Sequence, residues 1–206
     1  SASPEPDPDS APSVTPANSR ISEMISMIQD WLMLAKLDRG VLCESASLCD
    51  LGKIIEETLQ EYQQIPSANE ITLTGEIAPD LVPVRGDKAG LGLLVDNLVS
   101  NAVKYNRPGG KVTVRAGREG RSIVLEVSDT GLGIPQDFRP HLFEEFYRVK
   151  TPETQKIPGT GLGLVICKRI VDELGGSIEV DSKEGEYSVF TVKLPAAESE
   201  EEVDKN

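Results

Sequence analysis

The chain has 206 residues, of which 38% are hydrophobic and 27% charged, a composition typical of a globular protein with enough sequence for one good-sized domain. Its formal net charge is −13; residues 1–18 and 196–206 contribute −3 and −4, which leaves −6 for the region between them. An acidic chain of this kind argues against nucleic acid as a main partner, because neutralising a phosphate backbone requires clustered Lys and Arg. It does not exclude a nucleotide, which needs only a few local donors.

The cysteines and the hydropathy indicate the compartment. Cys43, Cys49 and Cys167 have no metal-ligand spacing and are odd in number, which predicts free thiols in a reducing, cytoplasmic environment. No apolar stretch reaches the roughly 18 residues of a membrane span, and no signal peptide is recognisable. Because the chain starts with Ser rather than Met, we expect it to be part of a longer protein, whose upstream region leaves an inner-membrane anchor open.

The first helix is predicted after a Pro-, Ser-, Ala- and Asp-rich segment, residues 1–18, which is expected to be a disordered linker or tag remnant. From Ile21 to Arg39 apolar residues recur at alternating steps of 4 and 3, the spacing of a helix in a coiled coil or bundle, and Gly40 ends the helix. This seam consists of Ile21, Ile25, Ile28, Leu32 and Ala35. One short helix cannot bury its own seam, so a partner surface is expected.

The rest of the chain alternates helices and strands. Each predicted helix has a cap or a stop signal, and the helices span 50–64, 87–107 and 161–174, with Asp50 and Asp87 as N-caps. The predicted strands are 71–77 and two hairpins, 111–116 with 122–128 and 178–181 with 187–194. This order predicts an α+β fold of two layers, with helices on one face of a mixed, mostly antiparallel sheet. The segment between Gly133 and Gly161 contains four prolines and is long enough to act as a lid.

The segment Asp96–Asn106, DNLVSNAVKYN, groups polar side chains on one helical face beside an apolar stripe. Asn97 and Asn101 are spaced i,i+4, and Lys104 and Tyr105 follow one turn later. A ligand with a metal ion, phosphates and a flat ring would use all four. The Asn101 oxygen suits Mg²⁺, with Asn97 as a second ligand or a residue that orients water; Lys104 suits a phosphate and Tyr105 a ring. The alternative is a solvated polar face.

Two glycine-rich loops follow. In DTGLGI, residues 129–134, Asp129 ends a predicted strand; its carboxylate only accepts hydrogen bonds, which suits an exocyclic amino group such as that of adenine, unless the loop is a plain turn. PGTGLGL, residues 158–164, leads into a helix, and backbone N–H groups at such an N-terminus bind phosphate. Its spacing matches neither a P-loop nor the dinucleotide-binding GxGxxG pattern.

Four motifs in order, DNLVSNAVKYN, DTGLGI, FEEFYRV and GTGLGL, resemble the N, G1, F and G2 boxes of sensor histidine kinases. These kinases belong to an ATPase superfamily that includes DNA gyrase, the Hsp90 chaperones and MutL. The resemblance covers residues 45–195 and implies the Bergerat ATP-binding fold, with ATP and Mg²⁺ as ligands. The F box is typical of the kinase branch, and Asn97 stands where gyrase-like members have a Glu that activates water.

The resemblance also implies residue roles. Catalytic roles fall on Asn97, Lys104 and Arg148, the last reaching either the γ-phosphate or the acceptor histidine. Asn101, assisted by Asn97, is the implied Mg²⁺ ligand, and Phe143 with Phe146 anchors the lid. The implied ATP contacts are Asn97, Asn101, Lys104, Tyr105, Asp129, Gly131, Gly133, Ile134, Phe146, Gly159, Thr160, Gly161, Leu162, Gly163 and Leu164. Relatives often carry Gly-Thr-Thr-Phe in the last strand; here Ser188 leaves a hydroxyl contact open.

The resemblance finally implies domains and partners. Residues 19–40, ending LAKLDRG, resemble the second helix of a dimerisation and phosphoacceptor hairpin; 45–195 resemble the catalytic ATP-binding domain, and 196–206 form an acidic, disordered tail. The hairpin's first helix, with the acceptor histidine, is not in this sequence, and we interpret His141 as structural or solvated.

The implied reaction transfers the γ-phosphoryl group of ATP to a histidine of the hairpin and then to an aspartate of a response regulator receiver domain. The parent is expected to be a homodimer and this portion a monomer, without nucleic acid. The alternative is a non-catalytic ATP-binding module whose lid closure signals to a partner.

Overall fold

The computed structural model describes residues 15–37, 47–65 and 70–197. Its helices are α1 (Thr15–Leu37), α3 (Leu51–Gln63), α4 (Lys88–Lys104) and α5 (Gly163–Glu173), with 3-10 helices η2 (Gln136–His141) and η3 (Thr154–Lys156). Its strands are β1 (Ser47–Cys49), β2 (Thr72–Ile77), β3 (Val84–Gly86), β4 (Lys111–Glu119), β5 (Ser122–Asp129), β6 (Ser177–Lys183) and β7 (Tyr187–Pro195).

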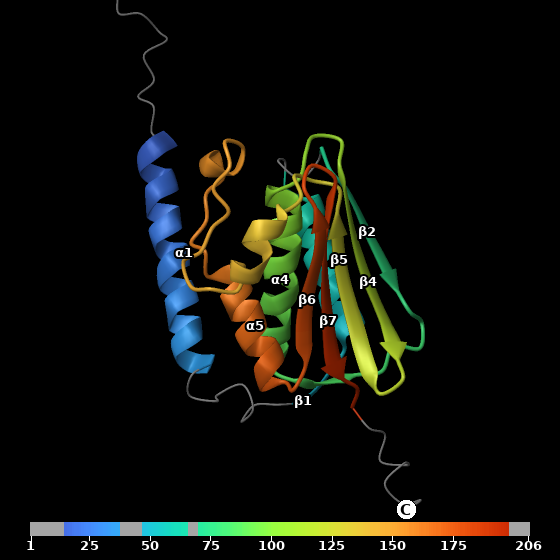
Figure 1. The fold of residues 1–206 in the computed structure, drawn as a ribbon. Helices are drawn as coiled ribbons and strands as arrows, with labels where there is room; N and C mark the ends of the chain where they lie inside the picture. The colour runs from blue at the N-terminus through green and yellow to red at the C-terminus, as the bar shows by residue number, and fades with distance from the viewer. Residues whose placement is uncertain (1–14, 38–46, 66–69, 198–206) are drawn as a thin grey trace, which may run out of the picture.

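The main sheet has five strands in the order β2-β4-β5-β7-β6, and only the β2–β4 pair is parallel. Helices α3, α4 and α5 lie against one face of this sheet (Figure 1). The register places Val127 opposite Val114 on one side and Phe190 on the other, and all three are buried in the core beneath the helices. The predicted α+β fold, with a mixed and mostly antiparallel sheet, is confirmed.

The caps that the sequence predicts are formed. The Asp50 side chain accepts a hydrogen bond from the Lys53 N–H at 3.0 Å, and the Asp87 side chain accepts one from the Gly90 N–H at 2.8 Å. The apolar stripe of α4, Leu94, Leu98 and Val99, is fully buried. Because this stripe faces the sheet, the polar residues of the same helix lie on another face, where they can meet a ligand.

Helix α1 starts earlier than predicted, and it packs on the domain with a face other than the predicted apolar seam. It begins at Thr15, inside the segment expected to be disordered, because Pro16 fits the first helical turn, where its missing N–H has no partner to lose. Leu34 and Leu37 are buried in the common core, and α1 lies beside α5 on the side away from the sheet (Figure 1). The seam residues Ile25 and Ile28, by contrast, are exposed. The predicted helix end at Gly40 lies outside the described residues, and so do residues 1–14 of the predicted linker. Of the predicted acidic tail, 196–206, the structure describes only Ala196 and Ala197.

Two features of the fold have no counterpart in the predictions. Strands β1 and β3 form a small antiparallel sheet, with Leu48 opposite Arg85. Three-residue strands are too short to show a periodicity. The segment predicted as a lid contains the short helices η2 and η3 rather than loop alone.

The thiols and the helices agree with the compositional expectations where they are described. Cys49 and Cys167 are free and buried, and burial raises the pKa of the Cys167 thiol. Cys43 lies outside the described residues. Among the described helices, none is both long enough and apolar enough to cross a membrane.

Candidate functional site

A cavity of about 620 Å³ lies between α4, the lid, the ends of β5 and β7, and α1. It brings together most of the predicted site: the lining includes Asn97, Asn101, Lys104, Tyr105, Asp129, Gly133, Ile134, Arg148, Gly159, Thr160, Gly161, Gly163, Leu164 and Ser188. A cavity of this size is in the range of nucleotide and cofactor sites. Three predicted contacts, Gly131, Phe146 and Leu162, are not part of the lining.

The amide face of α4 forms one wall. The Asn97 Nδ2 donates to the Leu93 carbonyl at 3.0 Å, which holds the carboxamide along its own helix. Its Oδ1 would lie 2.6 Å from a Cβ at position 163, so any side chain there would force the Asn97 carboxamide to move. The glycine that was expected to make room for phosphate therefore also makes room for Asn97, and it brings the start of α5 against α4. Within the described residues, the Asn101 side chain has no hydrogen-bond partner and faces the cavity.

A polar pair behind this wall was not predicted. Tyr62 of α3 donates to Asp96 Oδ1 at 3.0 Å and also interacts with Ser100. Burial, followed by the influence of Asp96, raises the pKa of Tyr62 to about 12, so its hydroxyl remains a donor. Asp96 and Ser100 both line the cavity one position before Asn97 and Asn101. The contact fixes the rotation of α4, and no sequence pattern joins position 62 to position 96.

Asp129 is the most strongly perturbed group of the site. It is only 6% exposed, and its Oδ1 accepts a hydrogen bond from the Gly131 N–H at 2.8 Å. Burial raises the pKa of this carboxyl from 3.8 to about 6, against the lowering effect of the Gly131 hydrogen bond. A buried carboxylate with a raised pKa that lines a cavity is typical of functional sites. Ser188 lies opposite Asp129 in the sheet register and lines the same cavity, so the hydroxyl left open by the sequence does reach the site.

The loop after Asp129 is held by backbone contacts. The Leu132 N–H donates to the Tyr105 carbonyl at 2.9 Å, which ties the loop to the end of α4. A Cβ on Gly133, whose φ is +63°, would collide with the Lys183 carbonyl. Gly131 likewise packs against Tyr105 rather than facing the cavity. The close approach of Gly131 brings this loop to the end of α4, and its predicted ATP contact stays a prediction.

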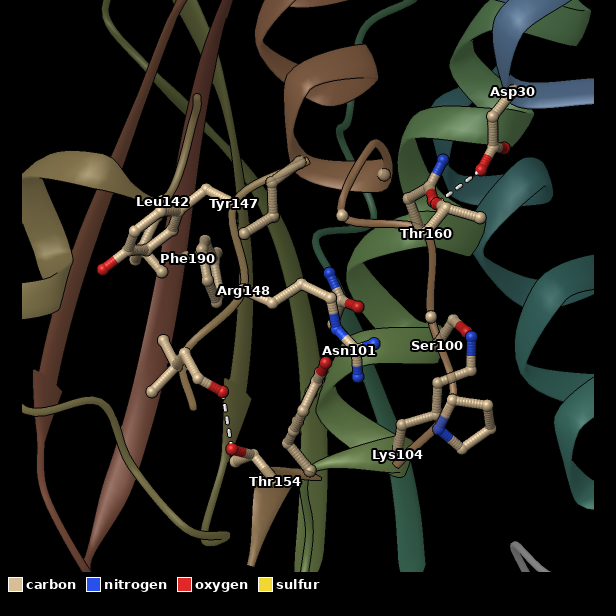
Figure 2. Close-up of a pocket in the computed structure, with 18 of the residues that line it drawn as sticks. Asp30, Ser100, Asn101, Lys104, Leu142, Tyr147, Arg148, Thr154, Thr160 and Phe190 are labelled. Atoms are coloured by element: carbon tan, nitrogen blue, oxygen red, sulfur yellow. Dashed lines mark hydrogen bonds between the residues drawn. The ribbon is translucent and has the colours of Figure 1, made fainter. Parts of the chain in front are cut away.

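The lid contributes Leu142, Tyr147 and Arg148 to the cavity. In Figure 2 the Arg148 side chain points across the cavity toward α4, and its Nη2 donates to the Ile157 carbonyl. Phe143 packs against the core, as expected of a lid anchor. The same expectation is wrong for Phe146, which is 54% exposed and adopts a positive φ of 62°. The backbone of Phe146 lies against Gly161, so this residue joins the lid to the glycine loop through its main chain.

Leu162 is fully buried in the hydrophobic core and does not line the cavity, so its side chain is not available to ATP and its predicted ATP contact stays a prediction for its backbone alone. It alternates with Gly161 and Gly163 and anchors the loop that they form. His141 also lies away from the cavity. Its Nδ1 is 2.7 Å from Glu144 Oε1 and its ring contacts Tyr147, with the side chain 48% exposed.

Helix α1 supplies a wall that the sequence did not predict. Gln29, Asp30, Leu32 and Met33 line the cavity, and Asp30 Oδ2 accepts a hydrogen bond from Thr160 Oγ1 at 2.8 Å. Figure 2 shows Asp30 reaching from α1 to Thr160. Asp30 lies outside the apolar seam, and no motif marks it.

Comparison with known proteins agrees with this geometry. The Synechocystis sp. sensor histidine kinase RppB is 35% identical over 85% of this chain, which spans 38% of that protein. The mycobacterial sensor histidine kinase MprB has a solved structure that is 30% identical with a TM-score of 0.63, covering 75% of this chain and 99% of that one. The structure of full-length ShkA in complex with AMPPNP is 25% identical with a TM-score of 0.71, covering 85% of this chain and 36% of that one.

The family itself is identified by a match over more than half of the chain. Residues 86–198, from the last residue of β3 to just past β7, match the family described as "Histidine kinase-, DNA gyrase B-, and HSP90-like ATPase". This range contains the Asn97–Asn101 face, Asp129 and both glycine loops. The chain belongs to the histidine kinase-, DNA gyrase B- and HSP90-like ATPase family.

Proposed function

We propose that this chain is the catalytic ATP-binding portion of a sensor histidine kinase, which binds Mg-ATP and transfers its γ-phosphoryl group to a histidine of a dimerisation hairpin. The observation that carries the proposal is the meeting of three different groups in one cavity: the buried Asp129 carboxylate, the Asn97–Asn101 face of α4, and the N-terminus of α5. A base reader, a metal and phosphate face and an anion site are the parts that a nucleoside triphosphate requires.

The residues fit the ligand. Asp129 would accept from the adenine amino group, with Tyr105 beside the ring, while Lys104 and Arg148 would contact phosphates. Mg²⁺ usually takes only one or two protein ligands and completes its shell with phosphates and water, which suits the unpaired Asn101 amide with Asn97 nearby. When bound, the ion would neutralise charge on the phosphates. Catalysis would rest on positioning and charge neutralisation by these side chains.

The exposed apolar seam of α1 supports the expected partner. Ile25, Ile28 and Leu32 are 51%, 58% and 57% exposed, while the opposite side of α1 packs on the domain. We propose that the first helix of the phosphoacceptor hairpin, which carries the acceptor histidine, covers this seam in a homodimeric parent. The phosphohistidine formed there would pass its phosphoryl group to an aspartate of a response regulator, on the cytoplasmic side where ATP is found.

A second function is favoured by one observation. His141 is the one histidine of the chain, and it lies away from the cavity. A module that binds ATP and signals through lid closure, without chemistry, would have this arrangement. Mixing the chain with a separate hairpin carrying an acceptor histidine separates the two functions. A kinase labels the hairpin from γ-labelled ATP, with a label that is lost in acid and kept in base; a non-catalytic module leaves it unlabelled.

Asn101 tests the nucleotide site directly. Asn101→Ala should remove most of the magnesium dependence of ATP binding in calorimetry, whereas Asn101→Asp, which keeps an oxygen at this position, should retain it. Unfolding midpoints of both variants should stay near that of the parent, because the side chain makes no hydrogen bond to the described residues. Equal magnesium dependence in Asn101→Ala and the parent would refute the metal role.

A further inference from the structure

Helix α1 contributes a carboxylate to the glycine-rich loop. Thr160 Oγ1 donates to Asp30 Oδ2 at 2.8 Å, and the two residues are 130 positions apart in the chain. The same hydroxyl accepts a hydrogen bond from the Leu162 N–H at 3.2 Å. Leu162 is the N-cap of α5, and it has no side-chain cap of its own. The Asp30 carboxylate is therefore linked through one hydroxyl to the N-terminus of α5.

Asp30 lies near the N-terminus of α5, where a negative charge is favoured. The N-terminus of a helix carries a partial positive charge and unpaired N–H groups. The first turn of α5 contains no acidic residue of its own, and a carboxylate reaches it from α1 through Thr160. Gly159, Gly161 and Gly163 line the cavity around the same point, which is where the phosphates of a nucleotide are expected.

One hydroxyl cannot serve both anions. Thr160 has a single hydrogen to donate, and Asp30 takes it in this arrangement. A phosphate at the α5 N-terminus would compete for that hydrogen and would also be repelled by the Asp30 charge in the same cavity. We propose that Asp30 acts as a built-in competitor of the nucleotide phosphates, so that docking of α1 on the glycine loop and binding of ATP oppose each other. This inference rests on the proposed function, because it takes ATP as the ligand.

The way α1 is attached makes such competition feasible. Leu34 and Leu37, at its C-terminal end, are buried in the core and hold the helix to the domain. Every apolar side chain that the structure describes in α1 before Asp30 is exposed, namely Met24, Ile25, Met27 and Ile28, so none of these side chains holds that part of the helix firmly to the domain. The helix can then tilt away at Asp30 while it stays anchored at Leu34. Nucleotide binding would thereby be coupled to the position of the helix that carries the exposed seam.

The test compares two isosteric charge removals. Asp30→Asn keeps an acceptor for Thr160 but removes the charge; Asp80→Asn removes the same charge from an exposed turn outside the cavity. Calorimetry measures Mg-ATP and adenosine binding to the parent and both variants. A hydrogen bond to a charged group exceeds a neutral one by about 1 kcal/mol, so Asp30→Asn should bind ATP about five- to tenfold more tightly. Adenosine, which has no phosphate, should bind all three proteins equally.

Reciprocity supplies a second measurement. If α1 docking weakens ATP binding, ATP must weaken α1 docking by the same factor. Amide hydrogen exchange within α1 of the parent should become faster with saturating ATP and stay unchanged with adenosine. In Asp30→Asn the ATP effect should shrink. All of these measurements use the whole 206-residue chain, so no part of it has to fold alone.

The outcomes separate the two proposals. Unchanged or weaker ATP binding by Asp30→Asn, an equal gain in Asp80→Asn, or an equal gain for adenosine would overturn the competition while leaving ATP binding by the parent intact. A parent that binds neither ATP nor adenosine would overturn the proposed function, and this inference with it. Asp30→Ala, which also removes the acceptor, should bind ATP at least as tightly as Asp30→Asn; weaker binding by both variants would make Asp30 a contributor to the nucleotide site instead.

Discussion

Replacing Asp129 with Asn should stabilise the fold while damaging the site. The carboxyl is 6% exposed, and burial raises its pKa from 3.8 to about 6. Each pKa unit corresponds to about 1.4 kcal/mol, so keeping this group charged in the folded protein costs about 3 kcal/mol at neutral pH. Asn has the same shape and is uncharged, and its Oδ1 can still accept the hydrogen bond from Gly131. We therefore expect Asp129→Asn to raise the free energy of unfolding by up to about 3 kcal/mol at pH 7.

The raised pKa of Asp129 also predicts how the stability difference between the two proteins changes with pH. Between pH 3.8 and about 6 the folded parent holds the Asp129 proton more tightly than the unfolded chain does, so this group makes the parent lose stability as pH rises through that window. The Asn variant lacks this contribution. Urea unfolding of both proteins should show a difference that is small near pH 4, grows toward pH 6 and is constant above it. Other carboxyl groups titrate in both proteins and largely cancel.

Asp80→Asn is the matched control, because it removes a carboxylate from an exposed turn. It should change stability by no more than about 0.5 kcal/mol at any pH. An Asp129→Asn variant that is less stable than the parent at pH 7, or whose difference is the same at pH 4 and pH 7, would refute the reasoning that burial dominates this carboxyl.

The remaining predictions concern base recognition, the glycine loop and the lid. ATP should bind better than GTP, Asp129→Asn should reduce that preference, and ATP affinity should fall as pH drops below about 6, all measurable by calorimetry. Gly133→Ala should lower the free energy of unfolding in urea by more than about 2 kcal/mol, because backbone strain adds to a collision with the Lys183 carbonyl. Gly120 has a similar φ but open space around it, so Gly120→Ala should lower the free energy of unfolding by only about 1 kcal/mol. Phe143→Ala should lower the free energy of unfolding by about 2 kcal/mol and Phe146→Ala by much less, since only Phe143 packs on the core. Equal losses for the two glycine variants, or for the two phenylalanine variants, would contradict the contacts described.

Short-range patterns in the sequence were sufficient for the main helices and for the strands of the five-stranded sheet, but not for β1, β3 or the short helices of the lid. Asp50 and Asp87 act as caps because a capping hydrogen bond spans only three residues. The spacing of Asn97, Asn101 and Lys104 places them on one side of α4 because the helical repeat alone decides it. Burial alternates along β4 and β5 for a similarly local reason, since the side chains of a strand alternate between its faces.

Only the tertiary structure decided which distant groups share the cavity and which predicted contacts do not. Ser188 reaches the site because the β5–β7 register sets it opposite Asp129, and the Leu162 side chain is absent from the cavity lining because it is buried in the core. The Asp30–Thr160 hydrogen bond depends on how α1 packs against α5. Periodicity and capping act over a few residues, whereas these contacts join segments far apart in the chain. Their geometry follows from the packing of whole layers, which no local pattern in the sequence encodes.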